Sequence, residues 1–333
     1  MLKKSMNQLL SKKVNQWLET ITDEELRKEI LKGLVITGGC FPSMIMNEIP
    51  KDFDCYFKTK ELTKKVAEYY AKVWNDGHTT STVSVIDCDE EWIELEKMTQ
   101  EEKEFFEENP SYNKTKGITM PFDEHRIKMY IQTGIVGDLE SVIADEELGL
   151  PQGSVEETVK ELDETSADEI LKEEKRKYFP VFISDNAITL SDGIQIVVRF
   201  HGEPDKIHDT YDFVHTKAYW TKETGTVIPN EVYEAVINKT LIYTGSKYPV
   251  CSVFRLRKFI ERGWKINVGQ ILKMCMQISE LNLQDINILS SQLIGVDSLY
   301  MLSLLEQFRK KKENDPNFDL TSNYVMSIID KIF

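Results

Sequence analysis

The stretch that decides the fold of this chain begins Leu34-Val35-Ile36-Thr37-Gly38-Gly39 and continues, a short way along, as Lys51-Asp52-Phe53-Asp54-Cys55-Tyr56-Phe57. The first run is apolar and ends in two glycines, and the second is apolar except for two aspartates at i and i+2. Side chains on a strand alternate between its faces, so Asp52 and Asp54 share one face while Phe53 and Cys55 enter the core. The sequence therefore predicts two successive strands, the second with a carboxylate pair on one face.

The carboxylate pair and the glycines together suit a nucleoside triphosphate (NTP) and Mg²⁺. Magnesium takes oxygen ligands and bridges to substrate phosphates, so Asp52 and Asp54 are candidate metal ligands. Gly38 and Gly39 let the backbone and a helix N-terminus approach the phosphates, and Ser43 is a candidate hydroxyl donor to them. Ser43 has a second interpretation as an ordinary N-terminal helix cap. These residues predict a nucleotide-binding site beside the first strand.

The composition is that of a soluble globular protein: 333 residues, 41% hydrophobic and 29% charged. This length is sufficient for two domains with cores of their own. The chain has no run of about eighteen apolar residues, and its first residues lack the apolar stretch of a signal peptide. We therefore expect no membrane contact and a cytoplasmic location.

The cysteines and histidines indicate neither a disulfide framework nor a metal site. The five cysteines are scattered and form no Cys-x-x-Cys pair, so we expect reduced thiols in the core. His201, His208 and His215 recur every seven residues, but a turn is expected between the first two and a strand at the third. We interpret these histidines as satisfied or surface side chains rather than metal ligands.

Charge divides the chain into regions with different expected partners. The formal net charge is −15, and residues 89–178, with 26 acidic and 11 basic side chains, account for all of it. This acidic region is expected to be helical and to have either a solvated face or a surface for a protein partner. Residues 247–273 are basic instead. Arg255, Arg257, Lys258 and Arg262 are the cations there that we expect to bind a triphosphate or an RNA backbone.

The hydrophobic pattern predicts an α+β fold. The expected domains are a head with a mixed β-sheet over residues 1–245, interrupted by an acidic helical insertion at about 89–178, and an all-helical domain over residues 246–333. Expected helices cover residues 2–32 (two helices), 42–47, 62–74, 90–108, 155–177, about 204–210, 251–261, 268–281, 297–311 and 321–333. Expected strands cover residues 34–37, 53–57, 80–86, 117–120, 125–131, 181–183, 187–190, 194–200 and 211–214.

The glycine pair followed by Asp-x-Asp resembles the signature of the polymerase-beta-type nucleotidyltransferase superfamily. The resemblance implies transfer of a nucleoside monophosphate (NMP) from an NTP to a hydroxyl, without a template, by two-metal chemistry. It also implies a third carboxylate on a later strand that faces the pair. Asp212, between Tyr211 and Phe213, is the candidate, and with Asp52 and Asp54 it completes the expected catalytic and Mg²⁺-binding set. The alternative for Asp212 is a sheet-edge aspartate or a turn partner.

A second resemblance lies in residues 248–266, which are similar to the helix after the catalytic head of bacterial poly(A) polymerases and CCA-adding enzymes. The matching positions are Pro249, Arg257, Gly263, Trp264 and Ile266. It implies an RNA 3′ end as a possible acceptor. Two arginines of that pattern are missing, however, and no Glu-Asp-x-x-Arg nucleobase motif is present.

Taken whole, the chain looks most like uncharacterised nucleotidyltransferase-like proteins of large tailed phages. If it is phage-encoded, the expected location is the host cytoplasm or the virion. Two functions stay open at this stage. One is a template-independent nucleotidyltransferase that uses ATP or another NTP, and the other is a non-catalytic, virion-associated structural or interaction protein on the same scaffold. An antitoxin-type or defence-related transferase is a variant of the first that differs in acceptor rather than fold. A small molecule or a protein hydroxyl is the alternative acceptor to an RNA 3′ end.

Overall fold

The computed structural model describes residues 3–78, 81–89, 126–131, 135–137 and 177–285, and single positions after them (288, 289, 292, 308, 311, 321, 323, 324 and 326). These residues belong to two compact units. The first unit holds the described residues up to Gly137 together with residues 177–209 and 216–229. The second holds residues 210–215 and the described residues from Asn230 onward. The division at residue 245 that the sequence suggests stays a prediction.

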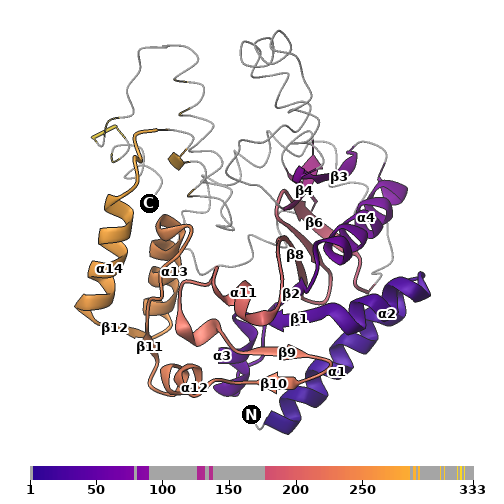
Figure 1. Ribbon diagram of the computed structural model, residues 1–333, viewed down its shortest axis with the longest axis horizontal. Helices are drawn as coiled ribbons and strands as arrows, with labels where there is room; N and C mark the ends of the chain where they lie inside the picture. Colours follow the sequence, from indigo (N-terminus) through magenta and orange to yellow (C-terminus); the bar gives the residue numbers. More distant parts are fainter. Residues whose placement is uncertain are drawn as a thin grey trace. The chain divides into compact units, whose positions relative to one another are not determined.

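The first unit is built on an eight-stranded mixed sheet with the spatial order β10-β9-β1-β2-β8-β7-β6-β5 (Figure 1). Its strands are β1 (Leu34–Thr37), β2 (Phe53–Phe57), β5 (Ile135–Gly137), β6 (Pro180–Ser184), β7 (Ala187–Leu190), β8 (Ile194–His201), β9 (Tyr219–Thr221) and β10 (Gly225–Val227). Within this sheet β2 and β8 pair in parallel, and the other neighbours pair antiparallel. Strands β3 (Val83–Asp87) and β4 (Ile127–Ile131) form a separate antiparallel pair.

The described part of the first unit has three longer helices, and the second and third begin where the sequence supplies capping side chains. They are α1 (Lys3–Thr20), α2 (Glu24–Gly33) and α4 (Lys60–Gly77), with the short helices α3 (Cys40–Ile45) and α11 (Pro204–His208). Asp23 accepts a hydrogen bond from the Leu26 amide at 3.0 Å to start α2, and Thr59 accepts one from the Leu62 amide at 3.2 Å to start α4. Helix α4 packs on β2 and β8, and α1 packs on β10 (Figure 1).

One row of apolar side chains crosses the sheet and forms its core. Successive register partners from β9 to β6 are Trp220, Ile36, Cys55, Ile196, Ile188 and Ile183. Each is at most 2% exposed. Register partners place their side chains on the same face of a sheet, so this row is a continuous apolar stripe. Burying a large aliphatic side chain contributes about 1.5–3 kcal/mol, so the stripe is a major source of stability.

Helices α1 and α4 cover the apolar face. The Lys13 ammonium of α1 lies 5.4 Å from the centre of the Phe53 ring in β2. The two helices are joined by a buried hydrogen bond in which the Trp17 indole donates to the Tyr70 hydroxyl at 2.6 Å. Burial raises the pKa of Tyr70 well above its usual value, so its hydroxyl stays protonated. This bond fixes α1 against α4 over the core.

In the second unit, residues 230–285 form the helices α12 (Asn230–Ile237), α13 (Pro249–Glu261) and α14 (Val268–Ser279) and the short strands β11 (Thr240–Leu241) and β12 (Lys265–Ile266). Strands β11 and β12 pair in parallel. Helix α13 ends at a glycine in the left-handed region, since Gly263 has a φ of 80°. The next amide, that of Trp264, donates back to the Phe259 carbonyl at 3.0 Å. Helix α14 begins at Asn267, whose side chain accepts from the Gln270 amide at 3.0 Å.

Most expected elements of the described residues are confirmed, with small shifts at their ends. The two N-terminal helices, β1, β2, β7 and the helices at α13 and α14 lie where the pattern placed them. The mixed sheet with helices agrees with the expected α+β class. The short helix after the glycines begins at Cys40, two residues earlier than expected. The expected helices at 90–108, 155–177, 297–311 and 321–333 and the expected strand at 117–120 lie outside the described residues or reach them only at single positions.

Two expectations about elements are wrong, and some of the observed elements were not expected. Residues 211–214 do not form a strand: Phe213 makes one isolated bridge to Tyr243, and Val214–Thr216 is a 3₁₀ helix. The part of the chain after residue 244 is not purely helical, because β12 lies there. Strands β9 and β10 and helix α12 were not expected, because their runs are too short for a clear period.

The expectations about the thiols and about membrane spans can be compared with the described residues. All five cysteines are free, and Cys40, Cys55, Cys88 and Cys251 are buried as predicted, whereas Cys275 is exposed on α14. In the described part of the chain, no helix has the length and apolar character that a membrane span requires.

The Trp17–Tyr70 bond yields a stability prediction. We expect Tyr70→Phe to lower the free energy of unfolding by about 1–3 kcal/mol, because it leaves a buried indole N–H without an acceptor. Tyr69→Phe is the matched control, since the Tyr69 hydroxyl contacts Thr22 at an exposed position. Urea unfolding of both variants measures the difference. Equal losses in the two would show that the buried bond does not hold α1 on α4.

Candidate functional site

A row of polar side chains crosses the opposite face of the sheet. Tyr219, Thr37, Asp54, Gln195 and Thr189 are successive register partners from β9 to β7. Each directly precedes or follows a member of the apolar row in sequence, so strand alternation places them on the other face. Neighbouring strands lie about 4.8 Å apart, and adjacent members of the row are therefore near neighbours. This face of the first unit carries the candidate site.

The Asp54 carboxylate lies directly against the turn after β1. A Cβ atom on Gly38 would lie 2.1 Å from Oδ2 of Asp54, and Gly38 has a φ of 87°. Both the space and the backbone conformation therefore require glycine at position 38. Gly39 differs, because a Cβ there would meet nothing within 4 Å. Asp52 precedes β2 and is exposed, and Asp54 is half-buried. The glycine turn and the carboxylate thus form one local structure, as the sequence spacing suggests.

Ser43 does not cap a helix. Helix α3 begins after Gly39, and Ser43 lies inside it with its hydroxyl donating to the Gly39 carbonyl at 3.3 Å. The interpretation of Ser43 as an N-terminal cap is therefore wrong, because the helix starts earlier than expected. Its side chain is only 9% exposed. Phosphate binding by Gly38, Gly39 and Ser43 stays a prediction.

His208 supports the end of β1 from α11. Its Nε2 lies 2.8 Å from the Thr37 hydroxyl, and that hydroxyl donates to the Ala218 carbonyl at 2.7 Å. A hydroxyl has one proton, so Thr37 accepts from an Nε2–H of His208. Burial, with the nearby Lys217 charge, lowers the pKa of His208 to about 4, so the ring is neutral near pH 7. His208 is thus a satisfied histidine, as expected.

Two buried thiols lie close to the same carboxylate. Burial raises the pKa of Cys40 and of Cys55 well above the usual value, and the Asp54 charge raises both further. Both thiols therefore stay protonated and are poor nucleophiles near neutral pH. They contribute packing near Asp54 and no covalent chemistry.

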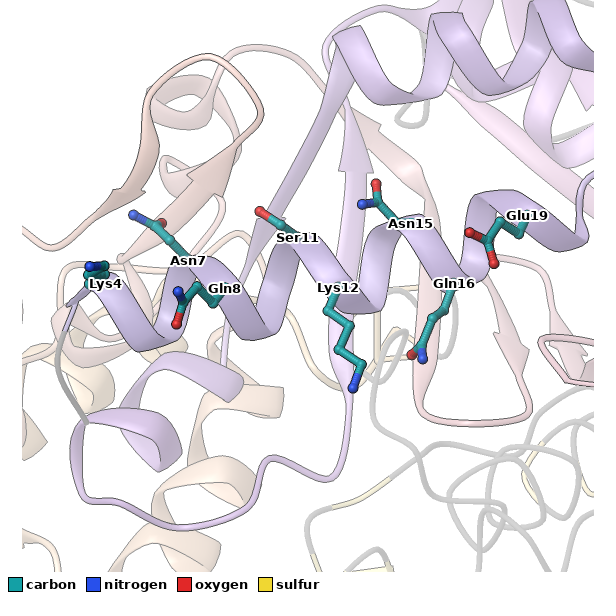
Figure 2. Close-up of a pocket in the computed structure, with 8 residues that line it drawn as sticks. All are labelled: Lys4, Asn7, Gln8, Ser11, Lys12, Asn15, Gln16 and Glu19. Carbon is teal, nitrogen blue, oxygen red and sulfur yellow. The ribbon is translucent and has the colours of Figure 1, made fainter.

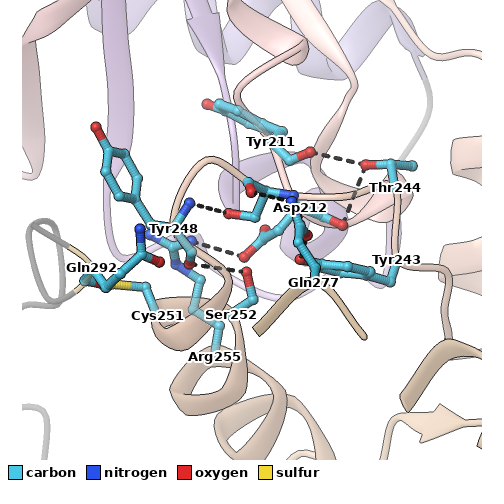
Figure 3. Close-up of polar contacts among 11 residues, drawn as sticks. Tyr211, Asp212, Tyr243, Thr244, Tyr248, Cys251, Ser252, Arg255, Gln277 and Gln292 are labelled. Atoms are coloured by element: carbon cyan, nitrogen blue, oxygen red, sulfur yellow. Dashed lines mark hydrogen bonds and ion pairs between the residues drawn. The ribbon is translucent and has the colours of Figure 1, made fainter. Parts of the chain in front are cut away.

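Asp212 belongs to the second unit and lies at a bend, not on a strand. Its carboxylate accepts from the Arg255 guanidinium at 2.8 Å, and only 8% of the Asp212 side chain is exposed (Figure 3). Its carbonyl accepts from the Thr244 amide at 2.9 Å. The expectation that Asp212 sits on an apolar strand is therefore wrong. Two of the predicted site residues, Asp212 and Arg255, bind each other.

The other predicted cations lie on or just after α13. Arg257 pairs with Glu261 one turn further along the helix, at 2.9 Å, and both side chains are about half exposed. Lys258 is in the last turn, and Arg262 is the C-cap. An exposed ion pair of this kind contributes little stability and opens readily. Binding of a nucleotide or RNA by Arg255, Arg257, Lys258 and Arg262 stays a prediction.

His215 is buried in the second unit without a hydrogen-bond partner. It is 0% exposed, and neither ring nitrogen is bonded. Its ring centre lies 4.4 Å from that of Phe259 and 4.3 Å from that of Trp264. Burial lowers the pKa of His215 to about 3, and the Asp212 charge acts in the opposite direction. The expectation of a strand at this residue is wrong, and so is that of a satisfied ring.

The predicted Mg²⁺ site consists of carboxylate oxygen ligands. Among the described residues, no group of three or more His, Cys, Asp and Glu side chains is arranged to hold a metal ion. Asp52 and Asp54 fit Mg²⁺ as a donor pair, since that ion commonly takes one or two carboxylates and completes its shell with water and substrate phosphates. The gathering of Asp212 with this pair stays a prediction.

A separate groove of about 690 Å³ follows the solvent side of α1 (Figure 2). Its lining is Lys4, Asn7, Gln8, Ser11, Lys12, Asn15, Gln16 and Glu19. All of these come from one helix face, and none is a predicted site residue. The groove is therefore a polar helix surface and is unrelated to the carboxylate pair.

The sequence did not predict that Thr37, Gln195 and Thr189 lie in one row with Asp54, or that His208 contacts Thr37. Gln195 sits in the apolar run of β8 and becomes visible only through the parallel pairing of β2 with β8. The resemblance places a third carboxylate on a strand that faces Asp54, yet the register partners of Asp54 are Thr37 and Gln195. The one available signal was a polar residue inside the run Ile194-Gln195-Ile196.

The fold and site define a mixed α/β protein in which a glycine turn lies against a carboxylate-bearing strand. A model of the Gabija anti-defense 2 family matches residues 8–239, and the chain belongs to that family. The match ends before α13. A search of curated proteins gives no match.

Among solved structures, a similar one is the Thermotoga maritima CCA-adding enzyme complexed with tRNA, with 11% identity and a TM-score of 0.33. The alignment covers 94% of this chain and 58% of that one. This chain therefore spans little more than half the length of that enzyme, and a likeness of this size carries no weight for function.

Gly38 and Gly39 form a matched pair for a stability test. We expect Gly38→Ala to lower the free energy of unfolding by about 2 kcal/mol or more, because the new methyl group collides with Asp54 and the backbone is left-handed. Gly39→Ala should cost less than about 1 kcal/mol. Urea unfolding of both variants checks this. A tolerated Gly38→Ala would mean that Asp54 does not lie on the turn.

The burial of His215 predicts acid sensitivity. Its folded pKa is about 3, and its unfolded pKa is about 6.5. The unfolded state therefore binds the proton first, and stability falls as pH drops below about 6.5. Between pH 8 and pH 5 the loss should be about 2 kcal/mol, and His215→Phe should remove it. Urea unfolding at both pH values, with His78→Phe as control, measures this. An unchanged acid loss in His215→Phe would contradict it.

Proposed function

We propose that this chain is a nucleotidyltransferase that moves an NMP from an NTP to a hydroxyl acceptor without a template. The observation that carries the proposal is the packing of the Asp54 carboxylate on Gly38. Asp52, two residues before it and exposed, is proposed as the second carboxylate. A triphosphate needs close approach to backbone and a nearby pair of oxygen ligands, and this local structure supplies both. We further propose Asp212 as the third carboxylate of the catalytic set.

In this proposal each residue has a simple task. Asp52 and Asp54 hold Mg²⁺, which when bound neutralises triphosphate charge and favours the leaving pyrophosphate. Gly38 keeps the turn free of a side chain, so the phosphates can lie against its backbone. The acceptor oxygen bonds to the α-phosphorus, the bond from that phosphorus to the pyrophosphate oxygen breaks, and the hydroxyl proton is released to solvent. Neutral His208 holds Thr37, and with it the end of β1, in place.

Family membership suggests where this activity would be used. The family is described as Gabija anti-defense. We propose that the transfer reaction counters the Gabija system, with an RNA 3′ end as the preferred acceptor and the cations of α13 as its backbone contacts. These cations lie beyond the residues that the family model matches, so their proposed part rests on the sequence of this chain and not on the family match.

A non-catalytic binding function is the second candidate, and two observations favour it. Both in-register neighbours of Asp54 are uncharged, Thr37 on β1 and Gln195 on β8. In addition, Asp212 is engaged with Arg255. A scaffold that had lost catalysis would retain the fold with such changes. In that case the chain would act on the Gabija system by binding one of its proteins.

One experiment separates the two functions. The protein is incubated with Mg²⁺ and each α-³²P-labelled NTP, with total RNA or with extract of cells that carry the Gabija system. We expect label transfer by the wild type and a loss of more than about a hundredfold in Asp54→Asn, because a metal ligand is removed. Asp76→Asn, at an exposed position of α4, is the control.

The same variants are then tested in cells that carry the Gabija system. If the enzyme is responsible, Asp54→Asn should fail to block the defence while Asp76→Asn blocks it. Full blocking by a folded Asp54→Asn protein would contradict the enzyme and support the binding function.

A further inference from the structure

We infer that Gln195 and Thr189 form the acceptor subsite of the proposed transferase and that the group they bind is the neutral diol of a terminal ribose. This inference rests on the proposed function for the direction of transfer. It adds the place where the acceptor lies and the chemistry that recognises it.

The order of residues across the sheet sets the place. Along the polar row, Thr37 and the adjoining Gly38 lie on the β1 side of Asp54, and Gln195 lies on the β8 side. If the triphosphate lies against the glycine turn, its leaving pyrophosphate is on the β1 side. The attacking and leaving oxygens in phosphoryl transfer are roughly in line on opposite sides of the phosphorus. The acceptor hydroxyl therefore approaches from the β8 side.

The side chains on that side are adjacent and available. Gln195 and Thr189 are register partners on β8 and β7, and both are half-buried. Their Cβ atoms are expected about 5 Å apart, as for directly opposed residues of an antiparallel pair. In the described part of the chain neither side chain makes a hydrogen bond within the protein. A half-buried amide beside a hydroxyl is thus free to bind a ligand, at a position where an unbonded polar group costs stability.

The chemistry of the pair identifies the ligand. An amide offers two donor hydrogens and an acceptor oxygen, and a threonine hydroxyl offers one donor and two acceptor sites. Neither carries charge, so the pair has no preference for a phosphate. Vicinal hydroxyls, each both donor and acceptor, match these groups. The 2′,3′-diol of a terminal ribose presents such a pair, whereas a serine or tyrosine side chain presents one hydroxyl only.

The test measures acceptor and nucleotide binding separately. The probes are a fluorescein-labelled hexa-adenylate with a 3′-terminal ribose, followed by fluorescence anisotropy, and Mg²⁺-ATP, followed by calorimetry. Gln195→Met keeps the length of the side chain and removes its polar atoms. We expect about tenfold weaker hexa-adenylate binding, since one or two hydrogen bonds are lost, and unchanged Mg²⁺-ATP affinity. Thr189→Val should weaken hexa-adenylate binding several-fold, and Gln16→Met on α1 is the control.

A hexa-adenylate whose last sugar is 2′,3′-dideoxy should bind wild type and Gln195→Met equally. Unchanged hexa-adenylate binding in both variants, loss of Mg²⁺-ATP affinity instead, or no hexa-adenylate binding by wild type would each overturn the inference. Label transfer is scored independently. A wild type that binds both probes as expected but transfers no label would refute the proposed transferase and leave the ribose-binding subsite standing.

Discussion

The register between β1, β2 and β8 is the constraint on which the rest of the first unit depends. It pairs Thr37 with Asp54 and Asp54 with Gln195 on one face, and Ile36 with Cys55 and Ile196 on the other. A shift of one residue in β2 would bury Asp54 in the apolar row, at a cost of several kcal/mol for an unpaired charge. The core thus fixes the position of the carboxylate.

The core also explains why the site can tolerate a strained turn. Gly38 holds a left-handed conformation with the Asp54 carboxylate against its Cα, and its amide donates to the Thr216 carbonyl at 3.3 Å. The strands on both sides are buried and cannot relax away. Thr37, which lies on the same face as Asp54, is bonded to His208 and to the Ala218 carbonyl and fixes the end of β1. The packed apolar face of the sheet in this way holds the polar groups of the other face at fixed positions.

The second unit is held together by different contacts. Its centre is aromatic, with His215 packed against Phe259 and Trp264. Its polar contacts include side chains that bind backbone, as when the Thr244 hydroxyl donates to the Tyr211 carbonyl at 2.9 Å (Figure 3). Asp212 and Arg255 neutralise each other there. A buried carboxylate paired with an arginine stabilises a local structure and, if the partner were drawn away by a phosphate, would become available as a ligand. The proposed roles of these two residues are therefore linked.

The sequence by itself determined the local structure around the site. Alternation predicted that Phe53 and Cys55 are buried and that Asp54 lies on the other face, and the glycine pair marked the turn, because these signals need only neighbouring residues. Tertiary structure decided which strands meet. Strand β8 lies far along the chain, so no local pattern places Gln195 beside Asp54, and a polar residue within an apolar run gives only a weak hint. The apolar context of Asp212 suggested a strand, but this short segment has one bridge, to Tyr243, and an ion pair with Arg255, and those long-range contacts set its conformation.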